Sequence, residues 1–373
     1  MNDSRIFAWD NYDDNPLDAI GVNTIPTQKE ATYAPATKGE LVTDAFDTFM
    51  SNGDEYAYPQ VVEVAGEEAK VLVFGEGFIS PEPQPEPPSA NGCMYLEAAQ
   101  ANSTVSMVST LETAPDLEYS TDGVTWQEWQ HTTADGTHTF DTITLGAVGD
   151  KVYFRGDNPN GLAFLPEGTI FPNFSNFVLT GSINGGGNIM SLLDKTMALT
   201  VVPQTGFTAL FAIMGEGIDP VLITAPAMDT ITAIGNAGCS GMYMGCAALT
   251  SAASMPSLTT IGDKGCATMY TGCAAITSAA DMTLLTTIGN SGCFEMYTGC
   301  TSLTTAASMP SLTTIGDNGC DSMYAGCIFD MSDDGSTLNF AFPTPPVTAG
   351  ETTYSTAYDI AEWMGNTNGF TNP

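Results

Sequence analysis

Eight of the nine cysteines in this chain fall into two series, and within each series neighbouring cysteines are 27 residues apart. Regularly spaced cysteines can bind a metal, form disulfides, act as nucleophiles or fill a hydrophobic core. Which role applies decides whether the chain is an enzyme or a scaffold that displays a surface. The first series is Cys239, Cys266, Cys293 and Cys320, and the second is Cys246, Cys273, Cys300 and Cys327.

The spacing of these cysteines argues against metal binding and catalysis. Zinc sites place their ligands in close pairs, often with histidine, but both histidines of the chain, His131 and His138, precede the repeats. The two cysteines of one repeat are seven residues apart, which is ~10 Å along a helix and too far for a disulfide. A disulfide between equivalent cysteines of adjacent repeats remains open. We favour a ladder of small buried side chains.

The acidic residues offer one further candidate site. Asp330, Asp333 and Asp334 lie together in "DMSDDGST" and are candidate calcium ligands, but the ligand order of an EF-hand is absent, so a solvated turn is the favoured interpretation. A phosphate-binding loop and a GxSxG motif are also absent. With 43 acidic residues in the chain, a chance pair of carboxylates carries no information. We expect no catalytic residues and no cofactor.

Each repeat reads as a short helix followed by a strand. On the helix, Cys266, Met269, Tyr270 and Cys273 have the spacing of one helical face. The stretch "AAITSAA" after it has strand character and is expected to form a parallel sheet with its copies. The predicted helix N-caps are Asn236, Asp263, Asn290 and Asp317, and the glycines predicted to end the helices in a left-handed conformation are Gly245, Gly272, Gly299 and Gly326.

A constant period in the twenties is typical of a leucine-rich-repeat α/β solenoid, which we place at residues 197–336. Residues 201–227 have the same length without a cysteine and are interpreted as a degenerate first coil. Residues 337–373 are expected to cap the open end with a strand at "TLNFAF" and a helix at residues 355–364. Ile360, Trp363 and Met364 of that helix are predicted to cover the last coil.

The rest of the chain is predicted to hold two smaller modules. Residues 1–78 read as an α+β attachment module, with a helix at 40–53 and a hairpin at 59–75, followed by a Pro-rich linker at 79–92. Residues 93–196 read as an antiparallel β-sandwich containing a hairpin that turns at Asp122-Gly123. We expect Trp126 and Trp129 to share one face of a strand, where core packing is favoured over a sugar-stacking platform.

Charge and hydropathy exclude several classes of partner. The formal net charge is −35, and a field of that sign repels nucleic acid and anionic lipid. No apolar run approaches the ~20 residues of a membrane-spanning helix. The first residues lack the basic start and apolar core of a secretion signal, so we expect synthesis in a cytoplasm without export by the common route.

The repeats resemble BspA-like leucine-rich repeats through the segments "GCAALTSA", "GCAAITSA" and "GCTSLTTA". Many members carry an aromatic residue where this chain has the first cysteine of each repeat. The segments "LEYSTDGVTW", "GDKVYFRG" and "GNIMSLL" are similar to a domain that precedes such repeats in surface proteins of gut bacteria and their phages. Together the resemblance covers roughly residues 93–335, and it implies an adhesin-like surface domain.

An adhesin-like domain without an export signal makes sense on a phage particle. We therefore expect a non-enzymatic virion structural protein, a head fibre or capsid decoration protein, that is located on the virion surface and forms a homo-oligomer. Residues 1–78 are expected to contact capsid or other virion proteins. The remainder is expected to bind a host-surface glycan or protein weakly and multivalently. The alternatives are a bacterial cell-surface adhesin and a tail-associated receptor-binding or glycan-active protein.

Overall fold

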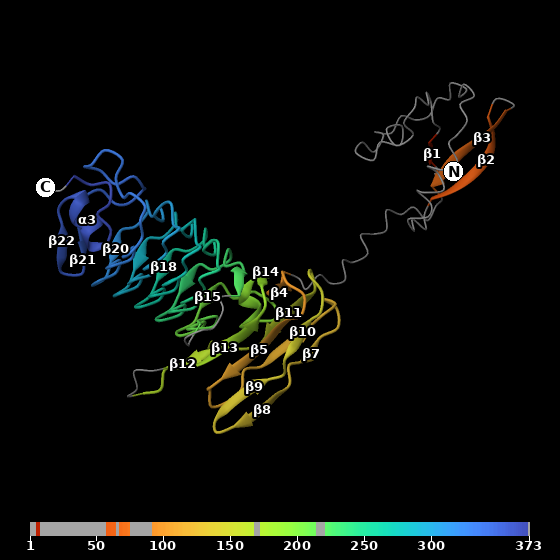
Figure 1. Cartoon of the computed structure of the whole chain (residues 1–373), viewed down its shortest axis with the longest axis horizontal. Helices are drawn as coiled ribbons and strands as arrows, with labels where there is room; N and C mark the ends of the chain where they lie inside the picture. The colour runs from red at the N-terminus through yellow and green to blue at the C-terminus, as the bar shows by residue number, and fades with distance from the viewer. Residues whose placement is uncertain are drawn as a thin grey trace. The chain divides into compact units, whose positions relative to one another are not determined.

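The computed structural model describes residues 92–167, 172–213 and 221–371, together with the backbone of three strands before them. The chain divides into two compact units, Met1–Glu86 and Pro87–Pro373, and the division falls inside the predicted linker. The described residues form several β-sheets and little helix, so the prediction of a β-rich protein is confirmed (Figure 1).

The first unit contains a three-stranded antiparallel sheet with the strand order β1-β3-β2. Strands β2 (Ala57–Val64) and β3 (Glu67–Phe74) form the predicted hairpin. Strand β1 (Arg5–Phe7) pairs with the far end of β3, in a stretch where the sequence showed no regular pattern. The predicted helix at 40–53 and the linker at 79–92 lie outside the described residues, except for Gly92.

Two six-stranded sheets, called here the two-sheet region, occupy most of residues 93–196. Buried and half-buried side chains alternate along the central strands, so each sheet turns one face to a shared core. The strands of the first sheet are β12 (Ala163–Phe164), β13 (Asn173–Thr180), β5 (Ser103–Ser109), β9 (Thr137–Phe140), β8 (His131–Ala134) and β10 (Ile143–Leu145). Those of the second are β16 (Leu222–Thr224), β14 (Ile183–Gly186), β4 (Tyr95–Ala98), β11 (Lys151–Gly156), β6 (Leu117–Ser120) and β7 (Gln127–Glu128).

The predicted hairpin in the second sheet is formed by β6 and β7. Asp122 holds its turn, because its Oδ1 accepts hydrogen bonds from the N–H groups of Thr125 (2.7 Å) and Val124 (2.8 Å) and from the Ser120 hydroxyl. These hydrogen bonds hold the pKa of the Asp122 carboxyl well below its usual range. The position of the turn fixes which residues of the two strands face each other.

A third sheet is parallel and built from two-residue strands in sequence order. The strands are β15 (Val201–Val202), β17 (Ala233–Ile234), β18 (Thr260–Ile261), β19 (Thr287–Ile288) and β20 (Thr314–Ile315). The prediction that the sheet lies in "AAITSAA" is wrong, because β18, β19 and β20 fall in the "TTIG" segments and β17 falls in "TAIG". Threonine and isoleucine are β-branched and favour strands more than alanine does. The predicted segment makes only isolated hydrogen bonds between repeats, such as Thr277 N–H to Thr250 O at 3.0 Å.

The predicted two-turn helices are not formed, because the backbone of each repeat makes a series of tight turns instead. Alternate N–H groups bond within the repeat and to the next repeat: Met269 donates to Cys266 O (3.2 Å), and Tyr270 donates to Met296 O (2.9 Å). Every fourth residue is left-handed, as at Thr268 (φ 55°) and Gly272 (φ 77°), which an α-helix does not tolerate. The four predicted terminal glycines are left-handed, but they end turns rather than helices.

The predicted N-cap residues have a different role, which corrects that prediction. In the first three, the side-chain Oδ1 accepts a hydrogen bond from the backbone N–H of the equivalent residue in the next repeat: Asn236 from Asp263 (2.9 Å), Asp263 from Asn290 (2.7 Å) and Asn290 from Asp317 (2.9 Å). The Oδ1 of Asp317 accepts from the N–H of Glu351 instead. The residues therefore stack as a ladder. Asparagine and aspartate alternate along it, so that no two of these carboxylates are adjacent.

This alternation predicts that Asn290→Asp destabilises the protein at neutral pH. The substitution keeps the acceptor oxygen but places a third carboxylate between Asp263 and Asp317, and each solvent-screened repulsion at one strand spacing costs about 0.5–1 kcal/mol. Asn236→Asp is the matched control, since its side chain has only one carboxylate neighbour in the ladder. In urea unfolding, the loss of unfolding free energy should be about twice as large for Asn290→Asp as for Asn236→Asp. High salt should reduce both losses. Equal losses that salt does not change would contradict the repulsion.

The two-sheet region and the repeats share one continuous hydrophobic core. An almost parallel stack of rings begins at Phe177 and Phe211 and continues through one tyrosine per repeat, with centroids 5.0–5.7 Å apart. Strand β14 also pairs in parallel with β16, the strand that precedes the first cysteine-containing repeat. The boundary predicted at residues 196/197 therefore does not separate two packing units. The tyrosines of the stack are Tyr243, Tyr270, Tyr297 and Tyr324.

The last repeat is covered by the predicted helix, α3 (Ala357–Trp363), with Thr356 as its N-cap. The carbonyls of Trp363 and Met364 accept hydrogen bonds from Ser322 and Tyr324, in the places where a further repeat would accept them. The strand predicted at "TLNFAF" is not formed; the strands here are β21 (Val347–Ala349) and β22 (Thr352–Tyr354). Isolated hydrogen bonds, such as Met309 N–H to Ala341 O, hold the predicted segment, which does not pair as a strand.

Candidate functional site

The cysteines of the repeats lie buried as free thiols, with exposed fractions of 0–5%. In the second series each Sγ–H donates to a backbone carbonyl, for example Cys273 to Tyr243 O at 3.1 Å. Burial raises the pKa of every one of these thiols, to about 12 for Cys293 and to about 11 for Cys327. Metal binding and nucleophilic attack both need a thiolate, which this environment disfavours.

The three calcium candidates are not arranged around a common point. Asp334 accepts hydrogen bonds from the Thr337 hydroxyl (2.7 Å) and from the N–H groups of Ser336 and Thr337, which hold the pKa of its carboxyl well below the usual range. Asp330 and Asp333 contribute a backbone carbonyl and a carboxylate oxygen to Asn339. Among residues 92–167, 172–213 and 221–371 no group of three side chains is placed to hold a metal ion.

The prediction that Trp126 and Trp129 share a face is wrong, because they are three residues apart and a strand alternates with period two. Trp129 is a core residue, 1% exposed, whose Nε1 donates to Asp141 O at 2.8 Å. Phe140 and Phe154 pack on it with ring centroids 5.0 and 4.9 Å away. Trp126 is half-buried, and the Arg155 guanidinium lies over its ring at 4.1 Å. The favoured interpretation, core packing, is confirmed for Trp129, while the Trp126 ring is covered on one face by Arg155.

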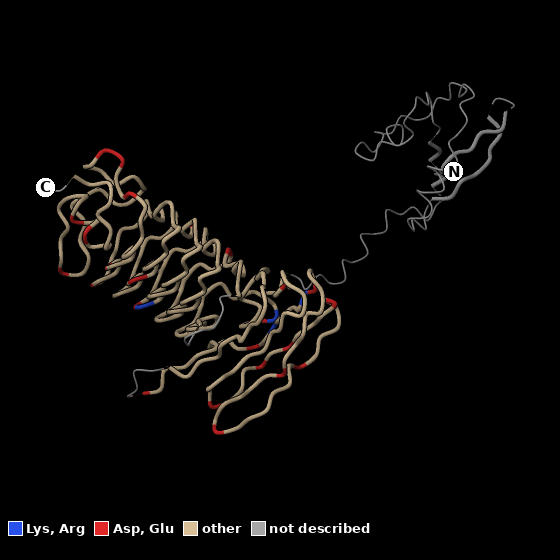
Figure 2. The backbone as a smooth tube through the Cα atoms, viewed as in Figure 1, with Lys and Arg blue, Asp and Glu red and all other residues tan. Residues whose placement is uncertain are grey.

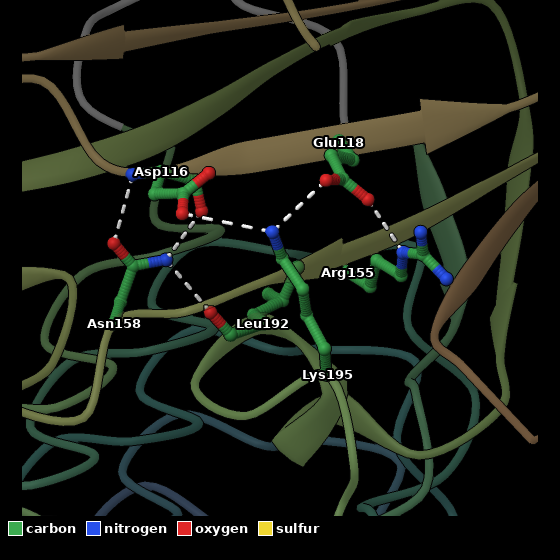
Figure 3. Close-up of polar contacts among 6 residues, drawn as sticks. All are labelled: Asp116, Glu118, Arg155, Asn158, Leu192 and Lys195. Carbon is green, nitrogen blue, oxygen red and sulfur yellow. Dashed lines mark hydrogen bonds and ion pairs between the residues drawn. The ribbon is translucent and has the colours of Figure 1, made fainter. Parts of the chain in front are cut away.

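A charged cluster joins β6, β11 and the segment after the 3₁₀ helix η1 (Ile189–Leu192) (Figure 3). Glu118 accepts from Arg155 Nε (2.6 Å) and Lys195 Nζ (2.9 Å), and Lys195 also pairs with Asp116 at 3.6 Å. Burial opposes ionisation of Glu118, but the hydrogen bonds from Lys195 and Arg155 outweigh it and lower the pKa of that carboxyl. Asn158 bonds both to Asp116 and to Leu192 O. These charges are paired, and the cluster ties the elements together.

Next to this cluster lies a pocket of about 230 Å³. The start of β6 and the segment that runs from β7 into β8 line it, and the β6–β7 pairing holds the two together through Trp129 N–H to Leu117 O at 2.8 Å. Sequence reasoning selected Trp129 but missed Asp116, Glu128 and His131, since only strand pairing brings them together. The lining residues are Ala114, Pro115, Asp116, Leu117, Glu128, Trp129 and His131.

The repeats themselves present rows of exposed or half-buried threonines. Each hydroxyl donates to a backbone carbonyl of the preceding repeat, so its rotamer is held and its donor is used; Thr286 Oγ1 to Thr259 O is 3.0 Å. Figure 2 shows few charged residues along this region. The rows are Thr232, Thr259, Thr286 and Thr313, and Thr250, Thr277 and Thr304.

Comparison with known proteins gives no assignment for this architecture. In the described part of the chain, no helix has the length and apolarity needed to cross a membrane. No protein-family model, no curated protein and no solved structure matches the chain.

Proposed function

We propose that this chain is a non-enzymatic virion structural protein, a head fibre or capsid decoration protein, whose ectodomain is a BspA-like leucine-rich-repeat solenoid. The sequence resemblance of residues 93–335 supports this proposal. So does the parallel sheet, in which the β17, β18, β19 and β20 partners are 27 residues apart. The thiols of the repeats are buried and held in the protonated form, which disfavours nucleophilic catalysis by these side chains.

The threonine rows are the observation that supports surface attachment best. They repeat the same small, uncharged side chain once per repeat, and since the hydroxyl protons are already donated, the hydroxyl oxygens are left as acceptors. Such a surface lacks the aromatic and arginine anchors of tight interfaces, so each copy binds weakly. Many copies on one particle raise the avidity by about 10²–10⁴ without new contacts.

Attachment to the particle is assigned to the first compact unit. It has its own sheet and forms a compact unit distinct from the rest of the chain. Its partners in this proposal are capsid or other virion proteins, and a homo-oligomer would multiply the ectodomains at each attachment point. The target of the ectodomain is a host-surface glycan or protein.

Deleting residues 1–78 tests this division of roles. We expect a soluble, folded fragment that unfolds like the full chain but no longer joins the particle. The full chain displayed in many copies should adhere to host cells far better than the single fragment. Normal incorporation of the fragment would refute the attachment role, and nanomolar binding by a single copy would refute the multivalent one. Recovery of the protein from bacterial envelopes rather than particles would favour the alternative, a cell-surface adhesin.

A further inference from the structure

The pocket beside the charged cluster has polar side chains that the fold does not use. The Glu128 carboxylate and the His131 ring nitrogens make no hydrogen bond or ion pair within residues 92–167, 172–213 and 221–371. Asp116 is engaged with Lys195 through one carboxylate oxygen, Oδ2. The pocket therefore presents unused acceptors from both of the segments that line it.

These exposed side chains stand on segments whose backbone is placed by strand pairing and hydrogen bonds. The His131 ring lies 5.2 Å from Phe140 and 5.1 Å from His138, which is itself fixed by Thr133 Oγ1 (2.8 Å) and Leu111 O (3.1 Å). Glu128 stands on β7, directly opposite Glu118 of β6. Asp116 is held by the Asn158 side chain, which accepts from its N–H at 2.9 Å. The backbone of both lining segments is thus placed before binding, and a ligand has to order mainly the Glu128 side chain.

The charges of the pocket select the chemistry of its ligand. Asp116 and Glu128 repel an anionic ligand, as does the net charge of −35. Lys195, which lies 3.6 Å from Asp116, disfavours a second cation at that wall. What remains is an uncharged ligand that brings several hydrogen-bond donors. Hydroxyl groups do this, and a hydroxyl that donates to a carboxylate makes a stronger hydrogen bond than one between neutral groups.

We propose that this pocket binds a terminal sugar unit of a neutral glycan, with its hydroxyl groups donating to Glu128, Asp116 and His131. This assignment depends on the proposed attachment function in one respect, because that function identifies the host surface as the source of the sugar. It deepens that role, because a pocket in the two-sheet region would supply recognition and the threonine rows would supply weak additional contact. Trp129 is only 1% exposed, so it offers no stacking face to the sugar.

The two histidines allow a direct test with the full chain. Proton NMR should resolve both imidazoles, since the chain has only His131 and His138. Methyl glycosides of glucose, galactose and N-acetylglucosamine are titrated separately, and at least one should shift the His131 signals with millimolar affinity, while the buried His138 shifts less. Sialic acid and methylammonium should leave both signals in place. Stronger binding of either charged probe, or no response to any neutral sugar, overturns the proposal.

Substitutions separate this site from the rest of the surface. Glu128→Gln keeps the shape and removes the charge, so we expect about fivefold to tenfold weaker sugar binding. Glu362→Gln makes the same change on α3, far along the chain, and should have no effect. Equal effects of the two variants overturn the pocket assignment. If host-cell adherence survives Glu128→Gln unchanged, the pocket is not the recognition site, whereas the proposed attachment function stands.

Discussion

Raising the pH above about 9 is expected to unfold the repeats in a steep transition. Burial raises the pKa of all eight repeat thiols, so the folded chain keeps them protonated at a pH where the unfolded chain ionises them. The unfolded state then binds fewer protons than the folded state, and stability falls as pH rises. Each thiol lowers the free energy of unfolding by about 1.4 kcal/mol for every pH unit above its pKa in the unfolded chain, which is about 8.5.

The size of the expected effect follows from the number of thiols. The eight thiols together lower the free energy of unfolding by about 7 kcal/mol at pH 9 and by about 16 kcal/mol at pH 10. A typical domain has a stability of about 5–15 kcal/mol. The transition should therefore fall between about pH 9 and 10. Above pH 10 the buried tyrosines add to it, because burial raises their pKa as well.

Circular dichroism against pH, in the presence of a reductant, measures this transition. The number of protons released on unfolding follows from its steepness, and Cys293→Ala should release one fewer. A thiol reagent at neutral pH should react with the native chain only as fast as it unfolds, since the thiols are both neutral and buried. A chain that stays folded at pH 10.5 would contradict this account.

Removing the hydroxyl of Tyr297 is expected to destabilise the protein by about 1–3 kcal/mol, whereas the same change at Tyr243 should be neutral or stabilising. The Tyr297 hydroxyl accepts a hydrogen bond from the buried N–H of Ala280 at 2.8 Å. Tyr297→Phe leaves that N–H without a partner. The Tyr243 hydroxyl is equally buried but has no hydrogen-bond partner among the described residues.

The sequence explains why the two tyrosines differ. Tyr270 and Tyr297 each accept from an alanine N–H 17 residues earlier. The equivalent residue for Tyr243 is Pro226, which has no N–H to donate. The phenylalanine variants are therefore a matched pair, identical in ring packing and volume. Urea midpoints with unchanged slopes would measure the difference, and a larger loss at Tyr243 than at Tyr297 would contradict this explanation.

Residue spacing alone indicates which side chains of the repeats face inward. The spacing of Cys266, Met269, Tyr270 and Cys273 placed them on one face, and all four are fully buried. That inference survives although the helix behind it is wrong, because the turns that replace it also bring every third or fourth residue to the same side. The helix α3 could also be predicted from local sequence, because Thr356 and Asp359, three residues apart, form a capping box at its start.

The tertiary structure decided where the backbone hydrogen bonds go. A helix and this series of turns use the same residues, but in the turns alternate N–H groups bond to the next repeat, as Tyr270 does to Met296. The side chain of Asp263 likewise accepts a free N–H, but from Asn290 of the next repeat rather than from its own turn. The pocket between Asp116 and His131 depends on strand pairing in the same way. Local sequence specifies which groups need partners, whereas only the packing of segments distant in the chain determines which partners they find.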